Sequence, residues 1–192
     1  MAGCGGEFAG PGDLDEYRDE VLDRYFTEDA ARILRYVPLS EGTVNVAAGF
    51  SVGPDWGSRL ASAVFGNGGE RQVLIVETVG ELVVFHEYIH QADYFGLIDR
   101  ELFASRYEQL LAGVGYRAIA EDAEATIIEL HSGDFLSQLA LAYNDGLTRE
   151  LIAYLIAGYV RGDYDLPEYF LEVYESVVRI PVSYDEVLDE IL

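Results

Sequence analysis

Hydrophobic residues in the first part of the chain recur with a helical period and then in alternation. From Asp13 to about Tyr36 they return every three or four positions, which predicts a helical region, in one or two pieces, that Pro38 ends. Three later segments are typical of strands, at 43–50, 59–65 and 71–78. The last two flank Asn67-Gly68, a hairpin turn signal. We therefore expect about three strands, two of them in a hairpin.

The hydrophobic pattern in the second half of the chain predicts helices almost throughout. A helix begins at about Val79, because Thr78 and Glu81 have the spacing of a capping box. Five more helices are predicted at about 99–112, 117–131, 134–143, 147–160 and 167–178. Early strands followed by helices favour the α+β class, with a small sheet in the N-terminal half and a mostly helical region after it.

No internal repeat or low-complexity linker divides the chain. Its 192 residues fit one domain, and half of them are hydrophobic, which is enough for a core. We predict a flexible, Gly-rich N-terminus at 1–12, followed by a single domain at 13–192.

The charge of the chain narrows the range of partners. There are 35 acidic residues against 12 basic ones, all of them arginine, for a net charge of −23. Nucleic acids and anionic membranes should repel such a surface, so we expect neither as a partner. No apolar run reaches the ~18 residues that a membrane span requires.

Because Cys4 is the single cysteine, the chain has no intramolecular disulfide. The residues around Cys4 also bear on where the protein is located in the cell. Cys4 lies in "AGCGG", which resembles the end of a bacterial lipoprotein signal, where the cysteine carries the lipid. On this interpretation residues 1–12 are a lipoprotein linker, and the protein is an extracytoplasmic lipoprotein anchored at Cys4. The alternative is a Gly-rich terminus with an incidental cysteine in a soluble protein.

The stretch "FHEYIHQADYFG" carries the clearest chemistry. His86 and His90 are two of the three histidines in the chain and lie one helical turn apart, as two ligands of one ion require. Glu87 is rotated ~100° from His86, so it can reach a water on the metal without binding the metal itself. This is the H-E-x-x-H pattern, in which the imidazoles hold Zn²⁺ and the glutamate takes a proton from the zinc-bound water. The alternative is a pair of histidines satisfied by hydrogen bonds in a core.

With this motif behind a predicted hairpin, the chain resembles the zincin metallopeptidases. A metzincin would continue with a glycine and a histidine where this chain has Asp93 and Gly96, so that branch does not fit. The resemblance is to the gluzincins, including small single-domain bacterial gluzincins and lethal-factor-like peptidases. It implies a third ligand from a glutamate on a later helix.

Four glutamates are candidates for that ligand: Glu121, Glu124, Glu129 and Glu150. A glutamate reaches an ion held on another helix only if the two backbones come close, which small residues on the same face allow. Glu150 has Ala153, Ala157 and Gly158 on its face. Around Glu121, Ala125 is followed by the bulky Ile128. We therefore prefer Glu150 and keep Glu121 or Glu124 as the alternative.

Three further side chains have candidate roles. Tyr154, one turn after Glu150, could donate a hydrogen bond to the oxyanion, and Asp93, three residues after His90, could orient a ligand histidine. The alternatives are that Tyr154 is an ordinary tyrosine without a catalytic role and that Asp93 is a solvated aspartate. The third histidine, His131, is interpreted as a helix-end residue rather than a ligand.

Together these features predict a zinc-dependent metallopeptidase that hydrolyses a peptide or protein substrate. The alternative is a zincin-like binding or assembly module that keeps the metal without turnover, because nothing in the sequence marks a specificity pocket. A metal-free helical scaffold is a third interpretation, which one zinc ion per chain would exclude.

Overall fold

The computed structural model describes the residues at 14–41, 45–46, 50–51, 61–65, 71–75, 80–132, 138, 141–142 and 145–180. Between 41 and 75 it gives the backbone and the side chain of Val73. The chain divides into two compact units, Met1–Ala92 and Asp93–Leu192. Cys4 and the flexible terminus predicted at 1–12 lie outside the described residues, so the anchor and its location stay predictions.

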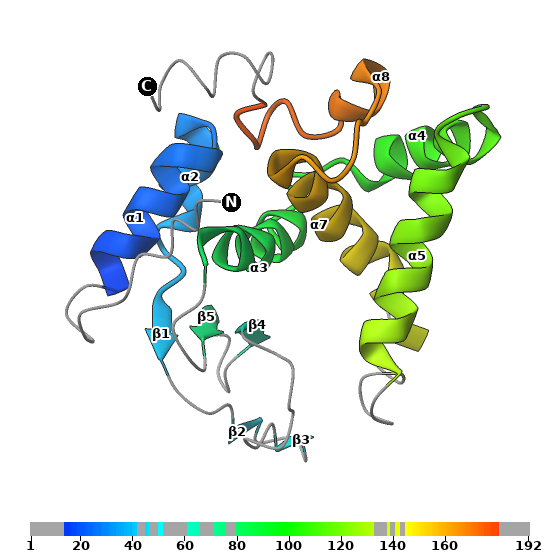
Figure 1. Cartoon of the computed structure of the whole chain (residues 1–192). Coiled ribbons are helices and arrows are strands. Elements are labelled where there is room, and N and C mark those ends of the chain that lie inside the picture. The colour runs from blue at the N-terminus through cyan, green and yellow to red at the C-terminus, as the bar shows by residue number, and fades with distance from the viewer. Residues whose placement is uncertain are drawn as a thin grey trace. The chain divides into compact units, whose positions relative to one another are not determined.

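Two helices open the first unit. α1 (Leu14–Tyr25) and α2 (Glu28–Leu34) are the two pieces of the helical region predicted before Pro38. They contact each other (Figure 1). Thr27 lies between the two helices and is the N-cap of α2. Its side-chain oxygen accepts a hydrogen bond from the Ala30 amide.

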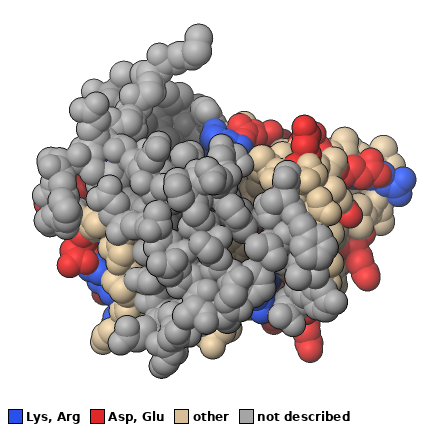
Figure 2. All heavy atoms as spheres, turned by 90° about the horizontal axis from the view of Figure 1, so that it is seen from below, with Lys and Arg blue, Asp and Glu red and all other residues tan. Residues whose placement is uncertain are grey.

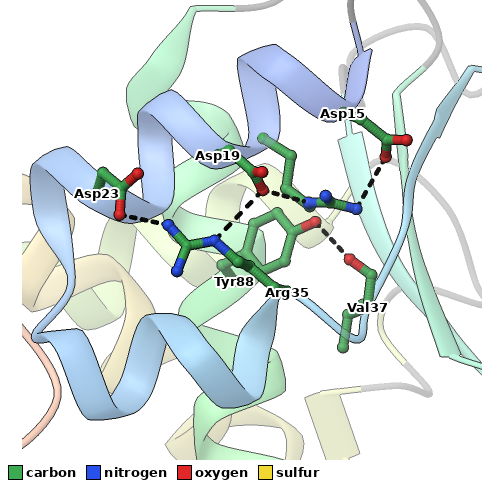
Figure 3. Close-up of polar contacts among 7 residues, drawn as sticks. Asp15, Asp19, Asp23, Arg35, Val37 and Tyr88 are labelled. Carbon is green, nitrogen blue, oxygen red and sulfur yellow. Dashed lines mark hydrogen bonds and ion pairs between the residues drawn. The ribbon is translucent and has the colours of Figure 1, made fainter.

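Arginine and aspartate side chains join these two helices. Arg35, just after α2, forms ion pairs with Asp23 and, at 3.6 Å, with Asp19 on α1 (Figure 3). Arg18 pairs with Asp19 and Asp15 within α1. Such partly exposed pairs stabilise a fold only weakly, so the apolar core contributes more to holding α1 and α2 together. Val21, Leu22 and Leu34 are fully buried there.

Five short strands follow α2: β1 (Leu39–Glu41), β2 (Asn45–Val46), β3 (Phe50–Ser51), β4 (Ala61–Phe65) and β5 (Arg71–Ile75). β5 pairs parallel with β1 and antiparallel with β4, with Val73 opposite Leu39 on one side and Ala63 on the other. β2 pairs antiparallel with β3. These pairings are relationships between backbones, and no described strand is longer than five residues.

The predicted fold class, α+β with a small three-strand sheet, is wrong. Among the residues whose side chains the structure describes, 70% are helical and 4% lie in strands, with one lone strand and no sheet. The strands β2 to β5 contribute only Val73 to these residues. Where a strand was predicted at 43–50, the structure describes two strands of two residues each, β2 and β3. Alternating apolar residues satisfy the strand pattern even where the backbone pairs only briefly, so the pattern overstated the strand content.

The motif lies on the helix that follows these strands. α3 (Glu81–Tyr94) starts two residues later than predicted, and Thr78, the predicted cap, lies outside the described residues. Glu81 bonds to α1, where it accepts from the Tyr25 hydroxyl at 3.0 Å and pairs with Arg24. The boundary between the two units falls near the end of α3.

The second unit is built from four described helices: α4 (Arg100–Ala112), α5 (Arg117–His131), α7 (Gly146–Arg161) and α8 (Glu168–Leu171). α5 packs against both α4 and α7, and α4 packs against α8 (Figure 1). Tyr174 is fully buried, and its hydroxyl donates to the Ile152 carbonyl of α7 at 2.9 Å. This bond ties the segment after α8 to the middle of α7.

The last predicted helix is shorter than expected. Instead of reaching residue 178, α8 ends at Leu171 and is followed by turns from Glu172 to Val177. The Val173 and Tyr174 amides bond to carbonyls three residues back, which is the tighter 3₁₀ pattern that commonly ends a helix. Of the helix predicted at 134–143, the structure describes only residues 138, 141 and 142, which are helical.

The described helices include none with the length and apolar character of a membrane span. On the face shown in Figure 2, acidic side chains recur across the described surface with arginines between them. This distribution agrees with the net charge of −23.

Candidate metal centre

The motif helix α3 is held through the face that lies opposite His86. Tyr88 is fully buried, and its hydroxyl donates to the Val37 carbonyl at 2.8 Å (Figure 3). Burial raises the pKa of this hydroxyl far above its usual value, so it remains a neutral donor. At ~100° per residue, Tyr88 lies ~200° around the helix from His86. Anchoring Tyr88 therefore turns His86 away from Val37.

Aromatic packing reinforces this orientation. The ring of Phe85 lies 5.0 Å from the ring of Tyr25 and 5.2 Å from that of Phe26, between centroids. Phe85 is fully buried, as is Ile89 one turn later. Since burying each such side chain is worth about 1.5–3 kcal/mol, the rotation of α3 about its own axis is well determined within the first unit.

His86 and His90 face each other on consecutive turns of α3. Their Nε2 atoms lie 3.1 Å apart, and their ring planes are nearly perpendicular at 84°. Both side chains are half-buried. Two imidazoles that meet through the same ring nitrogen either share one proton or offer two lone pairs to a cation. The sequence spacing predicted this proximity of the two rings.

The separation of the two nitrogens fits a zinc ion. With Zn–N bonds of ~2.0–2.1 Å and tetrahedral angles, two ligand nitrogens should lie about 3.4 Å apart. The observed 3.1 Å differs from that value by a few tenths of an ångström. The pair can therefore hold one ion through both Nε2 atoms without a change of helix geometry.

Glu87 lies next to His86 on α3 and is only 9% exposed. One residue of helix rotates it ~100° from His86, so its carboxylate does not point along the direction shared by the two histidines. A carboxylate in that position can accept a proton from a water beside the pair. The role of Glu87 as the base stays a prediction.

Glu150 lies in the first two turns of α7 and is paired with a histidine. Its Oε1 atom lies 3.7 Å from Nε2 of His131, and its side chain is 25% exposed. His131 is the last residue of α5, as predicted, but it is largely buried. The pairing of Glu150 with His131 was not predicted from the sequence. No spacing rule links residues on two different helices, although a chain with only three histidines makes each of them a candidate.

The alternative third ligands have different surroundings. Glu121 and Glu129 are exposed on α5. Glu124 is half-buried, and its charge and hydrogen bond contribute, after burial, to raising the pKa of Tyr107 to about 12. Glu124 is therefore engaged within its own unit. The choice among the four glutamates stays a prediction.

Tyr154 belongs to a cluster of polar aromatic residues beside α7. Its ring lies 6.0 Å from that of Tyr164, whose hydroxyl donates to Asp122 at 3.1 Å. Burial, followed by the hydrogen bond and charge of Tyr154, raises the pKa of Tyr164 well above its usual value. Gly158 makes room for this ring, because a Cβ atom there would lie 2.4 Å from Tyr164 Cδ2. The absence of a side chain at Gly158 therefore allows the Tyr164 ring to pack directly against α7.

Asp93 is buried and forms a two-point ion pair. Both of its carboxylate oxygens accept from Arg100, each at 2.6 Å. This pair joins the end of α3 to the start of α4, across the turn in which Gly96 adopts a φ of 70°. A carboxylate has lone pairs beyond these two bonds, so the predicted orienting role of Asp93 stays a prediction.

Comparison of the chain with protein-family models, with curated proteins and with solved structures found no match. The resemblance to zincins therefore rests on the motif residues themselves.

Proposed function

We propose that this protein is a zinc-dependent metallopeptidase whose ion is held by His86, His90 and Glu150. The observation that carries the proposal is the 3.1 Å separation of the two histidine Nε2 atoms on α3. The third ligand is assigned to Glu150 from the gluzincin resemblance, which implies a glutamate on a later helix. Two imidazoles and one carboxylate leave a fourth position open, which is typical of catalytic zinc sites.

The chemistry is divided between the ion and the chain. A bound zinc ion would polarise the scissile carbonyl and lower the pKa of a water. Glu87 accepts the proton of the attacking water and returns it to the leaving amine. Tyr154, four residues after Glu150, would exchange its hydrogen bond with Tyr164 for one to the oxygen on which negative charge develops. The substrate is a peptide or protein.

The proposal is tested with a broad peptide library. The wild type, loaded with zinc, should cleave members of the library, and a chelator should abolish the cleavage. Glu87→Gln should lower the rate by at least ~10², because an amide cannot accept the proton. It should keep its zinc, because the side chain is not a ligand. Cleavage by Glu87→Gln at the wild-type rate would contradict the mechanism.

One outcome separates the peptidase from a binding module. If the wild type binds one zinc ion per chain but cleaves no peptide in the library, the zincin-like binding or assembly role becomes the better account. The protein would then bind zinc through the same ligands but would not hydrolyse peptides.

A further inference from the structure

His131 is held in one orientation by its own helix. Its Nδ1 atom donates to the Ile127 carbonyl at 2.8 Å, one turn back on α5, because a carbonyl oxygen can only accept. The residue is 9% exposed, and Ile127 is 1% exposed. With Nδ1 donating to this carbonyl, the second ring nitrogen, Nε2, lies 3.7 Å from Oε1 of Glu150 and attracts the carboxylate when the ring is protonated on both nitrogens.

We propose that His131 is a positioning residue that orients the Glu150 carboxylate for metal binding. The inference rests on the proposed function, because it assigns His131 a role in the same zinc site. A glutamate side chain has three rotatable torsions, and fixing them costs conformational free energy when the carboxylate becomes a ligand. A neighbour that already restricts the carboxylate lowers that cost, and partners that orient ligands in this way are typically worth 10–100-fold in metal affinity.

The packing of the second unit supports a fixed relationship between the two residues. α5 and α7 pack against each other. His131 is the last residue of α5, and Glu150 is the fifth residue of α7. Leu151 and Ile152, which follow Glu150, are buried. The ring and the carboxylate are therefore brought together by two packed helices rather than by flexible segments.

Two variants separate the contact to Glu150 from the contact to Ile127. His131→Asn keeps an amide near the position of Nδ1, where it can still donate to the Ile127 carbonyl, but has no atom at the position of Nε2. His131→Gln reaches toward the position of Nε2 and can donate to Glu150. We expect zinc affinity, measured by competition with a chromophoric chelator, to fall about 10–100-fold in His131→Asn. In His131→Gln it should recover most of that loss.

A double-mutant cycle then tests whether His131 acts through Glu150. In a Glu150→Ala background, His131→Asn should cause no further loss of zinc affinity, because the carboxylate that it orients is gone. An equal loss in both backgrounds would overturn the proposal, since it would indicate a general effect on the fold. Circular dichroism and thermal unfolding of the metal-free proteins check that each variant is folded.

The remaining outcomes distinguish this proposal from the proposed function. If the wild type binds zinc and His131→Asn binds it equally well, the role of His131 is refuted and the zinc site stands. Equal losses in His131→Asn and His131→Gln would also refute it. If the wild type binds no zinc, both proposals fail.

Discussion

His86 and His90 bring their Nε2 atoms to within 3.1 Å of each other on consecutive turns of α3. The arrangement depends on the opposite face of the helix, where Tyr88 is fixed to Val37 and Phe85 packs against Tyr25. The residues that orient the histidines thus alternate with them along the sequence, since Phe85 precedes His86 and Tyr88 lies between His86 and His90. A change on the anchored face should therefore affect the stability of the unit that carries the pair.

The first prediction concerns the third ligand. Glu150→Ala should weaken zinc binding by at least about 10², because losing a ligand should cost no less than losing a residue that orients one. Glu121→Ala is the matched control, since Glu121 is exposed on α5 and should leave the affinity unchanged. Both affinities are measured by chelator competition. Loss of affinity in the Glu121 variant alone would show that the wrong glutamate was chosen.

A second prediction tests the anchor of α3. Tyr88→Phe removes the donor to the buried Val37 carbonyl, so the free energy of unfolding should fall by about 1–3 kcal/mol. Tyr36→Phe removes the same hydroxyl from a residue that is 85% exposed and should change the stability by less than about 0.5 kcal/mol. Urea unfolding of the three proteins measures both values. Equal stability of both variants would show that the Tyr88 bond contributes nothing.

The third prediction concerns Gly158. A Cβ atom at this position would lie 2.4 and 2.6 Å from two ring carbons of Tyr164, so Gly158→Ala should destabilise the protein by about 1–3 kcal/mol. In a Tyr164→Ala background the obstruction is absent. There the same substitution should stabilise the protein by up to about 1 kcal/mol, because alanine favours a helix over glycine. The sign of the effect should therefore reverse, as thermal unfolding would show, and an unchanged sign would contradict the packing.

The sequence predicted what depends on local geometry. The spacing of His86 and His90 determines their proximity once the segment is helical, and the bounds of the helices at 99–112 and 147–160 were predicted to within one or two residues. Both signals come from residues on the same helix. Asp99 also caps α4 through its side chain, a local signal of the same kind.

Features that depend on distant segments were not predictable in the same way. The fold class was wrong because alternating residues at 43–50 indicate a strand without indicating whether a partner extends it. β1 at Leu39–Glu41 was missed because three residues are too few to show a period. The bond between Tyr88 and Val37 and the pairing of His131 with Glu150 each join two elements, and neither residue of a pair indicates its partner.

The central claim is that His86 and His90 hold a zinc ion, and metal analysis tests it most directly. The wild type and His86→Ala are expressed with zinc available and purified without chelators, and the zinc content of each is measured by elemental analysis. The account predicts one zinc ion per wild-type chain and far less than one in the folded His86→Ala variant. A wild type without zinc, or a variant with as much zinc as the wild type, would contradict it.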